Sequence, residues 1–271
     1  MSQRIFITGG ASGLGRALAE RFARAGWRVC IADLNDARGA ETLTSLKSKG
    51  ASATEYLHCD VTKEEDLTAA ARRLEELWGG VDVVVNNAGV AQAGAIEEVS
   101  IDDWRWIIDI NLLGVVRGCK VFTPMFKKQR GGYFVNVASM AGLLDAPMMS
   151  SYNATKAAVV SLSETLQNEL VDAGIHVSVV CPAFFKTNLT ESLRTPDPGM
   201  RAKMDKLLNR SNVTAEDVAN KVFQVVERKQ FYVLTHPQAE YAWILKKLLP
   251  RTLYSTAMRR MTQGMRPRQR A

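Results

Sequence analysis

A glycine-rich stretch near the N-terminus constrains the fold of this chain more than any other feature. Residues 8–15 read TGGASGLG and follow a short apolar run, residues 4–8, that is typical of a buried strand. Residues 14–25 then carry an apolar helical face and end at Gly26. A strand, a glycine turn and a helix in this order predict a phosphate site. Small residues let the backbone approach a pyrophosphate, whose charge is met by free N–H groups at the start of the helix.

The remaining chain alternates predicted strands and helices. Strands are expected at residues 28–32, 53–58, 82–85, 133–138, 175–180 and 231–234, and helices at 62–78, 100–128, 151–173 and 214–228. The sequences of residues 62–65 and 214–217 predict N-terminal caps for two of the helices. Residues 188–210, apolar and with two prolines, are expected to form a mobile lid. This alternation predicts an open α/β sheet, for which 271 residues is the size of one domain.

The net charge of +7 belongs to the C-terminal end of the chain. Residues 237–271 hold eight basic residues and one acid, so the first 236 residues are neutral overall. The basic residues follow no nucleic-acid reading motif, and we expect no nucleic-acid partner. Apolar runs are shorter than the ~18 residues of a membrane span, and the N-terminus lacks a signal peptide's apolar segment. Four scattered cysteines and three scattered histidines predict reduced thiols in a cytoplasmic protein and no metal site.

Asp33 ends the second predicted strand, 20 residues beyond Gly13. A carboxylate at this spacing can accept hydrogen bonds from an adenosine ribose and would repel a 2′-phosphate. The spacing therefore favours NAD over NADP as the coenzyme. Alternatively, Asp33 caps the following helix, a role that Asn35 or Asp36 could fill instead.

Three residues between 135 and 156 form a candidate catalytic group. Ser139 follows a predicted strand, whereas Tyr152 and Lys156 lie four residues apart on a predicted helix, so their side chains leave one face one turn apart. An adjacent ammonium lowers the pKa of a phenol below its usual ~10, and the phenol can then carry a proton to or from a hydroxyl or carbonyl. The serine hydroxyl can hold the same oxygen. The trio suits the interconversion of an alcohol with a ketone or aldehyde, although Tyr-x-x-x-Lys also occurs by chance in amphipathic helices.

Five motifs in order resemble those of the short-chain dehydrogenase/reductase family of NAD(P)-dependent enzymes. They are TGGASGLG, the NNAG of residues 86–89, Asn111, Ser139 and the YNATK that begins at Tyr152. The resemblance covers residues 4–234. It implies a single Rossmann-type, doubly wound domain with a parallel sheet of seven strands, order 3-2-1-4-5-6-7, and helices on both faces. We assign the catalytic domain to residues 1–236 and an amphipathic extension to residues 237–271.

The resemblance also implies roles for individual residues. Tyr152 would be the general acid/base, Ser139 would hold the substrate oxygen, Lys156 would bind the nicotinamide ribose and lower the Tyr152 pKa, and Asn111 would fix a water in a proton relay. Ala183 departs from the glycine usual in the family. Coenzyme contacts are implied for Gly9, Ser12, Gly13, Leu14, Gly15, Asp33, Asp60, Val61, Asn87, Ala88, Gly89, Tyr152, Lys156, Pro182 and Thr187. Ser12 and Leu34 stand where NADP-preferring relatives commonly carry a base, which again favours NAD.

The residues near this group are apolar and rich in methionine, and they predict an apolar substrate such as a long-chain or cyclic alcohol or ketone. They are Val90, Met140, Leu143, Leu144, Met148, Met149, Phe184, Phe185, Met200 and Met204. The competing interpretation is that several of them belong to the core.

The extension, residues 237–271, interleaves large apolar residues with lysine and arginine. One interpretation is a peripheral contact with an anionic membrane, and the other is packing over the lid or a subunit interface. The resemblance implies a homodimer or homotetramer. A different class of function, a dinucleotide-binding regulator or scaffold without turnover, stays open at this point, although such proteins usually lose the tyrosine or the lysine.

Overall fold

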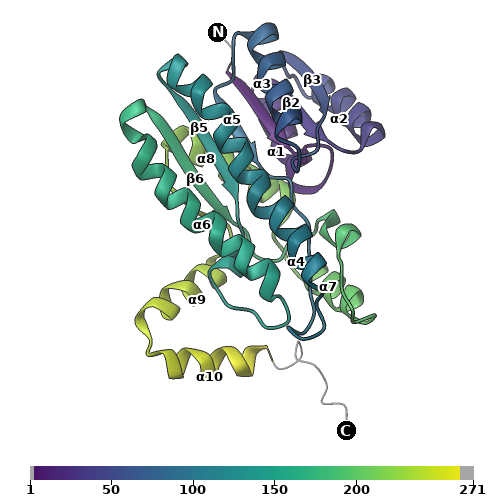
Figure 1. Ribbon diagram of the computed structural model, residues 1–271, viewed down its shortest axis with the longest axis vertical. Helices are drawn as coiled ribbons and strands as arrows, with labels where there is room; N and C mark the ends of the chain where they lie inside the picture. Colours follow the sequence, from purple (N-terminus) through teal and green to yellow (C-terminus); the bar gives the residue numbers. More distant parts are fainter. Residues whose placement is uncertain (1–2, 263–271) are drawn as a thin grey trace.

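A seven-stranded parallel sheet forms the middle layer of the protein in a computed structural model, which describes residues 3–262 (Figure 1). The strand order is β3-β2-β1-β4-β5-β6-β7, which confirms the expected order. The chain changes direction between β1 and β4, and in such sheets the ligand crevice lies at this point, beyond the carboxyl ends of the strands. The strands are β1 (Arg4–Thr8), β2 (Arg28–Asp33), β3 (Ala53–His58), β4 (Val83–Asn86), β5 (Gly132–Val137), β6 (Ile175–Cys181) and β7 (Tyr232–Leu234).

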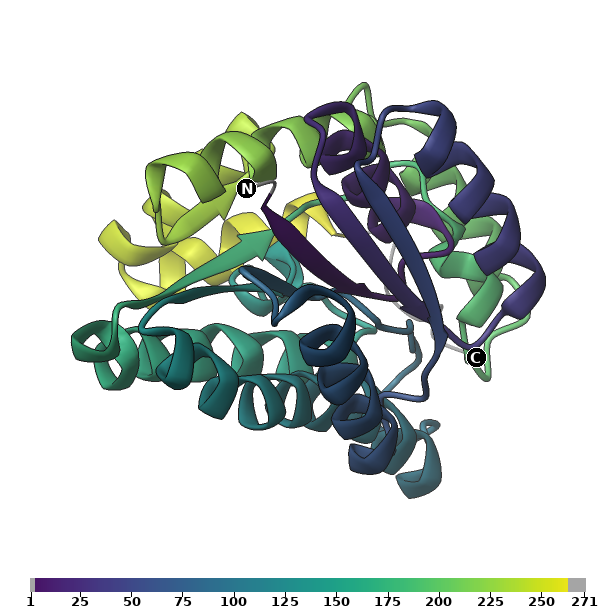
Figure 2. The same cartoon turned by 90° about the horizontal axis from the view of Figure 1, so that it is seen from above.

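Helices cover both faces of the sheet, as Figure 2 shows from above. The helices α1 (Gly13–Arg24), α2 (Asp36–Ser48) and α8 (Ala215–Arg228) pack on one face, and α3 (Glu64–Trp78), α5 (Gly114–Gln129) and α6 (Ser150–Leu170) on the other. Side chains alternate across β1, so that Phe6 enters one core while Ile5 and Ile7 enter the other. The doubly wound single-domain fold is therefore confirmed.

One of the two predicted helix caps is wrong. Thr214 forms a capping box with Asp217 at the start of α8, as expected. Thr62 does not cap α3, whose N-terminal flanking residue is Lys63 and lacks a side-chain cap. The Thr62 hydroxyl instead donates a hydrogen bond to Asp60 Oδ1, at 2.7 Å. Thr62 is therefore bound to the carboxylate of Asp60 and not to that of Glu65.

The predicted long helix at residues 100–128 is interrupted by one π-helical turn. It consists of α4 (Ile101–Ile108), the π turn η1 (Asp109–Leu113) and α5. Asn111 lies buried in this turn, where its side chain accepts a hydrogen bond from Val90 N–H and donates one to Val90 O, at 2.8 and 3.0 Å. A polar residue is thus retained inside a helix because it holds the loop after β4.

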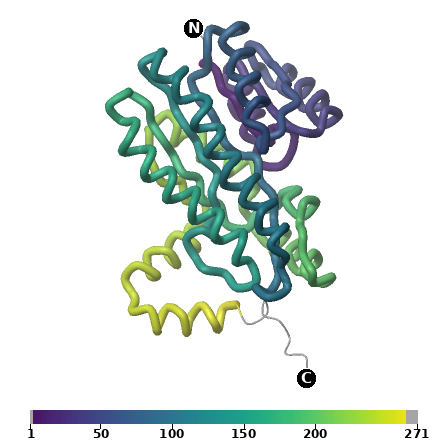
Figure 3. Tube along the Cα trace, viewed as in Figure 1, coloured from purple at the N-terminus to yellow at the C-terminus, as the bar shows by residue number. Residues whose placement is uncertain are grey.

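Two helical segments lie beyond the carboxyl ends of the strands. Residues 188–210 contain the 3₁₀ turn η4 (Asn188–Ser192) and α7 (Met200–Asn209), and their mobility stays a prediction. Residues 237–262 form the helices α9 (Pro237–Leu248) and α10 (Arg251–Met261), called the C-terminal helical pair below (yellow in Figures 1 and 3). Short 3₁₀ turns also occur at η2 (Met140–Gly142) and η3 (Val171–Ala173). Within residues 3–262 no helix has the length and apolar character needed to cross a membrane.

Candidate active site

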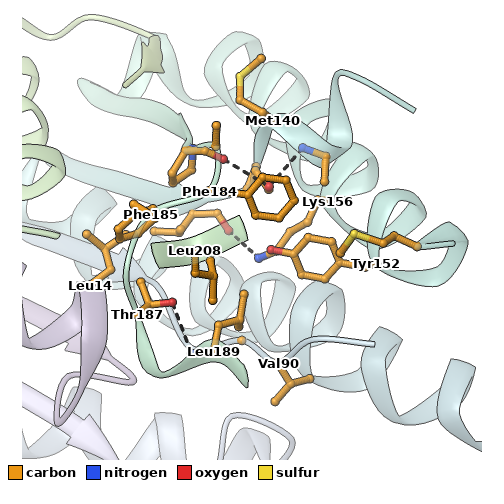
Figure 4. Close-up of a pocket in the computed structure, with 18 of the residues that line it drawn as sticks. Leu14, Val90, Met140, Tyr152, Lys156, Phe184, Phe185, Thr187, Leu189 and Leu208 are labelled. Atoms are coloured by element: carbon orange, nitrogen blue, oxygen red, sulfur yellow. Dashed lines mark hydrogen bonds between the residues drawn. The ribbon is translucent and has the colours of Figure 1, made fainter. Parts of the chain in front are cut away.

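A cavity of about 730 Å³ opens at the carboxyl ends of the strands. The glycine turn after β1, the ends of β4 and β5, the first turns of α6 and the C-terminal helical pair all contribute to its wall. Figure 4 shows Tyr152 and Lys156 in this cavity with Thr187 and several apolar side chains around them. Residues that are far apart in the sequence, from 9 to 262, therefore surround one space.

The glycine turn leaves room for a ligand and little room for side chains. Gly9 and Gly13 have φ angles of +63° and +51°, which favour glycine. A Cβ on Gly9 would lie 2.9 Å from Ala88 Cα, and one on Gly15 would overlap the Gly9 carbonyl oxygen. The side chain of Ser12, the residue before α1, does not cap this helix, so no side-chain cap occupies its first N–H groups. The turn fits the pyrophosphate of a dinucleotide, since a helix N-terminus attracts negative charge.

Asp33 lines the cavity at the end of β2. Its Oδ2 accepts a hydrogen bond from Ala11 N–H at 3.0 Å, which fastens the glycine turn to β2. Asn35, not Asp33, caps α2 by accepting from Arg38 N–H at 3.0 Å, so the alternative role for Asp33 is filled by its neighbour. The Asp33 carboxylate therefore stands at the cavity wall, where a ribose would meet it.

Arg38 is a cavity residue that the sequence analysis missed. Its guanidinium pairs with Glu191 of η4 at 2.8 Å, across 153 residues of sequence. The pair links α2, beside Asp33, to the segment after β6. A basic residue five positions after Asp33 gives no local pattern that would mark it as part of the site.

The segment after β4 is fastened to the end of β1. Asn87 Nδ2 donates to Thr8 O at 2.9 Å, and the Thr8 hydroxyl accepts from the N–H groups of Asn87 and Ala88. Ala88 and Gly89 line the cavity with Asn87. A Cβ on Gly89 would lie 3.2 Å from Asn111 Oδ1 and 3.6 Å from Lys156 Nζ, so both polar groups border this glycine.

The candidate catalytic residues meet where β5 ends and α6 begins. Tyr152 and Lys156 project from the first two turns of α6 and are both buried, with Lys156 Nζ 5.8 Å from the centre of the Tyr152 ring. Lys156 Nζ donates a hydrogen bond to Val137 O at 2.9 Å. The Ser139 hydroxyl donates to Pro182 O at 3.3 Å and accepts from Ala141 N–H at 3.1 Å. All three side chains line the cavity.

Burial shifts the pKa values of Tyr152 and Lys156 in opposite directions. It lowers the pKa of Lys156 from 10.5 to about 8, because the charged form loses its hydration. It raises the pKa of Tyr152, and hydrogen bonding with Ser139 acts in the opposite direction but is the smaller effect. The expectation that Lys156 holds the Tyr152 pKa below its usual range is therefore wrong for the protein alone. Lys156 Nζ donates its hydrogen bond to Val137 O, and burial of the phenol is the largest influence on the Tyr152 pKa.

Most of the sequence-derived residues line this cavity. Pro182 and Thr187 lie on the wall after β6, and Thr187 faces the turn at Gly13, where an added Cβ would be 3.8 Å from Thr187 Cβ. Ser12, Leu14, Asp60 and Val61 are also on the wall. Gly15 and Asn111 are not, because Gly15 packs against Gly9 and Asn111 binds the backbone of Val90.

The apolar residues divide between the cavity and the core. Those on the cavity wall are Val90, Met140, Leu144, Met149, Phe184, Phe185 and Met204. Leu143, Met148 and Met200 do not line it and pack in the clusters behind it. The wall is completed by residues of the later segments that the sequence analysis did not place there, Leu189, Leu208, Leu245, Leu249, Met258 and Met261. The space beside Tyr152 is thus mainly apolar.

Two further polar groups hold the walls in position. His236 accepts a hydrogen bond from Ala183 N–H at 3.2 Å, and its other nitrogen lies 3.1 Å from Phe184 O. Burial lowers the pKa of His236. Lys246 of α9 donates to Leu143 O at 2.7 Å and pairs with Asp145 at 2.9 Å, which fastens the C-terminal helical pair to the loop after β5. The only sequence signal for the contact between Lys246 and the loop after β5 is the basic character of the extension.

The described residues contain no group of three or more histidine, cysteine, aspartate or glutamate side chains that could hold a metal ion. All four cysteines are free and buried. Among the titratable and hydroxyl side chains that line the cavity with the glycine turn are those of Tyr152, Lys156 and Ser139.

Comparison with known proteins gives consistent matches. The family model described as short chain dehydrogenase matches residues 3–198. The probable oxidoreductase EphD of Mycobacterium tuberculosis is 32% identical over 266 residues, which cover 95% of this chain and 45% of that protein, so the chain spans about half of that relative's length. The 3beta-hydroxysteroid dehydrogenase 1 of Eggerthella lenta is 34% identical over 218 residues, which cover 79% of this chain and 83% of that protein.

A solved structure is similar over most of its length. It is the crystal structure of a short-chain dehydrogenase/reductase from Burkholderia phymatum in complex with NAD, with a TM-score of 0.86 and 34% sequence identity. The similarity covers 91% of this chain and 93% of that one.

Proposed function

Because the chain belongs to the short-chain dehydrogenase/reductase family, we propose that it is an NAD-dependent oxidoreductase that interconverts an alcohol with a ketone or aldehyde on an apolar substrate. One observation carries the proposal. Tyr152, Ser139 and Lys156 line the same cavity as a glycine turn whose geometry fits a pyrophosphate. A proton-transfer group and a dinucleotide site in one space are what such a reaction requires.

Each residue has a stated task in this proposal. The glycine turn binds the pyrophosphate through backbone N–H groups, and Asp60, Val61, Asn87, Thr187 and Pro182 with their neighbours form the remaining coenzyme wall. The nicotinamide, when bound, supplies the hydride acceptor or donor. The Ser139 hydroxyl holds the substrate oxygen, and Tyr152 accepts or donates its proton at the phenol oxygen.

Lys156 binds the ribose hydroxyls and favours the phenolate of Tyr152 through its charge. This electrostatic assistance needs the ammonium form, which the cavity disfavours by lowering the Lys156 pKa to about 8. Asn111 Oδ1 and Lys156 Nζ border the same glycine, and this supports the proposed relay through a water between them.

NAD is the proposed coenzyme because Asp33 stands at the wall beside the glycine turn. Its charge would repel a 2′-phosphate and accept hydrogen bonds from free ribose hydroxyls. The similar structure from Burkholderia phymatum contains NAD, which supports this choice. Arg38 is the basic side chain near Asp33 that could bind a 2′-phosphate, but its guanidinium is paired with Glu191.

The substrate is proposed to be apolar because seven of the ten apolar residues that the sequence suggested line the cavity. A relative named for a hydroxysteroid reaction supports the same class. An alcohol series from short polyols to medium-chain and cyclic alcohols tests it. A preference for sugars or short polyols would contradict the proposal.

We also propose that the protein works as a homodimer or homotetramer in the cytoplasm. The domain division at residue 236 is part of the same proposal, with the C-terminal helical pair as an addition to the catalytic domain. Light scattering of the purified protein checks the assembly, and a monomer at all concentrations would contradict it.

Tyr152→Phe is the decisive experiment for the reaction. The phenyl ring keeps the packing and loses the proton, so turnover should fall by at least about a hundredfold. NADH binding, followed by fluorescence titration, should stay within about twofold of the wild type. Substantial residual turnover would contradict the role of Tyr152. A wild type that binds NADH and turns over no alcohol or carbonyl compound would instead indicate a regulator or scaffold.

A further inference from the structure

Exposed apolar side chains gather on the C-terminal helical pair. Of the thirteen large apolar side chains that are exposed in residues 3–262, seven lie between residues 237 and 262. They are Tyr241, Ile244, Leu245, Leu248, Leu249, Leu253 and Met261. A concentration of this kind on a short segment marks a surface that binds something apolar.

The same surface is basic. The helical pair carries five lysine and arginine residues and one acid, Glu240. Lys246 and Arg251 turn toward Asp145, at 2.9 and 3.7 Å. Lys247, Arg259 and Arg260 have no carboxylate partner within the part of the chain that the structure describes. Arg259 and Arg260 are therefore available to an anionic partner, and Lys247, which lies over the Trp243 ring at 3.6 Å, is exposed beside them.

The inner side of the helical pair is part of the cavity wall. Ala242, Leu245, Leu249, Met258 and Met261 line the cavity, and three of them, Leu245, Leu249 and Met261, are also exposed to solvent. The apolar lining beside Tyr152 is thus continuous with the exposed apolar surface. In Figure 1 the two helices lie beyond the carboxyl ends of the strands, at the same end of the molecule as the cavity.

We propose that the C-terminal helical pair docks on an anionic lipid bilayer and admits an apolar substrate from the bilayer to the cavity. Helices α9 and α10 have twelve and eleven residues, too short to span a bilayer, so they lie in the interfacial region with their apolar side chains inserted. The lysines and arginines then face the anionic headgroups. The admission step rests on the proposed function, whereas the docking itself does not.

A bilayer fits this surface better than a second copy of the chain. A symmetric contact would place the same basic face on both partners and bring like charges together. An anionic bilayer supplies the opposite charge along with an apolar layer.

Vesicle flotation with the full-length protein tests the docking. Vesicles of phosphatidylcholine alone are compared with vesicles containing about 30 mol % phosphatidylserine, which supply the negative surface potential. Wild-type protein should float with the anionic vesicles at low salt, and binding should fall at high salt. Arg259→Glu with Arg260→Glu should weaken binding by more than about tenfold, since each basic residue near such a surface contributes about fivefold.

The apolar contribution has a matched control. Leu248→Ser with Leu253→Ser removes side chains that are 75% and 58% exposed, and binding should fall by about tenfold or more. Leu77→Ser with Val171→Ser removes side chains that are 38% and 48% exposed at the ends of α3 and α6, on the amino-terminal side of β4 and β6, and should leave binding unchanged. Turnover of a water-soluble alcohol should be unaffected in both double variants.

The outcomes separate this proposal from the proposed function. Normal turnover of a soluble alcohol without vesicle binding would overturn the docking and leave the reaction intact. Vesicle binding without turnover of any alcohol or carbonyl compound would support the docking and contradict the proposed reaction. Equal binding to neutral and anionic vesicles, or equal losses in the Leu248/Leu253 variant and the Leu77/Val171 control, would also overturn the docking. Dimerisation in the absence of lipid that the leucine variant abolishes would identify a second copy of the chain as the occupant.

Discussion

Replacing Lys156 by methionine should stabilise the coenzyme-free protein at neutral pH. Lys156 is buried, and burial lowers its pKa from 10.5 to about 8. At pH 7 the unfolded chain therefore holds the proton more tightly than the folded protein, which costs about 3 kcal/mol of stability. Methionine keeps much of the length and has no charge to desolvate. The variant loses the hydrogen bond to Val137 O, which offsets about 1 to 2 kcal/mol of the gain.

The pH dependence of this difference is specific to the buried lysine. As the pH rises through 8, the folded protein loses the proton while the unfolded chain keeps it up to about 10.5, so the slope of stability with pH is positive. Between pH 7 and pH 9 the cost to the wild type falls from about 3 to about 2 kcal/mol. The advantage of Lys156→Met should therefore shrink by about 1 kcal/mol over this interval.

Urea unfolding followed by circular dichroism at pH 7 and pH 9 measures both quantities. Lys127→Met, which removes an exposed lysine, is the control and should show no such pH dependence. The variant at position 156 should also lose turnover, since the ammonium no longer assists Tyr152. A stability difference between wild type and Lys156→Met that is the same at both pH values would refute the reasoning. So would a variant that is less stable than the wild type at pH 7.

Three further predictions concern the coenzyme side of the cavity. Gly15→Ala should weaken dinucleotide binding and lower the free energy of unfolding by about 1 to 3 kcal/mol, because its Cβ would overlap the Gly9 carbonyl; calorimetric binding and urea unfolding measure the two effects. Asp33→Asn should raise kcat/KM for NADP relative to NAD by at least about tenfold, since a unit charge near the 2′-phosphate is removed, and an unchanged ratio would argue against its proximity to the ribose. Glu191→Gln should leave the melting temperature nearly unchanged, because the pair with Arg38 is exposed, and should lower the KM for NADP by freeing the guanidinium. Glu191→Gln combined with Arg38→Gln should cancel that gain.

The architecture was predictable because it is encoded locally. Parallel strands covered on both faces are short apolar runs, and for that reason the prediction of a strand at residues 4–8 matches the observed bounds of β1. The cap at Thr214 was found by the same kind of local pattern. The predicted cap at Thr62 is wrong because Asp60 Oδ1 accepts hydrogen bonds from both the N–H and the hydroxyl of Thr62, in place of the Glu65 carboxylate, and a pattern over residues 62–65 does not include Asp60. The π turn at Asn111 is not predicted from the sequence, because its cause is a contact with Val90, 21 residues earlier.

The sequence predicts the motif residues that line the cavity, and it does not predict which later segments complete the cavity wall. The carboxyl ends of parallel strands meet at one edge, so motifs that follow β1, β4 and β5 line one cavity. Arg38 with Glu191 and Lys246 with Asp145 join segments 153 and 101 residues apart, and their meeting depends on how the loops pack. No periodic pattern carries that information, which is why the role of the C-terminal helical pair in the wall was left open.

The spacing of Tyr152 and Lys156 does not determine their protonation states. The four-residue interval between Tyr152 and Lys156 sets which side chains are neighbours, and that follows from helix geometry alone. Their charges depend on burial, which favours the neutral form of each and so shifts the pKa values in opposite directions. A charged Lys156 beside Tyr152 would favour the phenolate, whereas a neutral Lys156 would not. Anything that gives Lys156 acceptors besides Val137 O keeps it charged and thereby favours the phenolate. Burial of Lys156 therefore opposes the charge that the proposed assistance to Tyr152 requires.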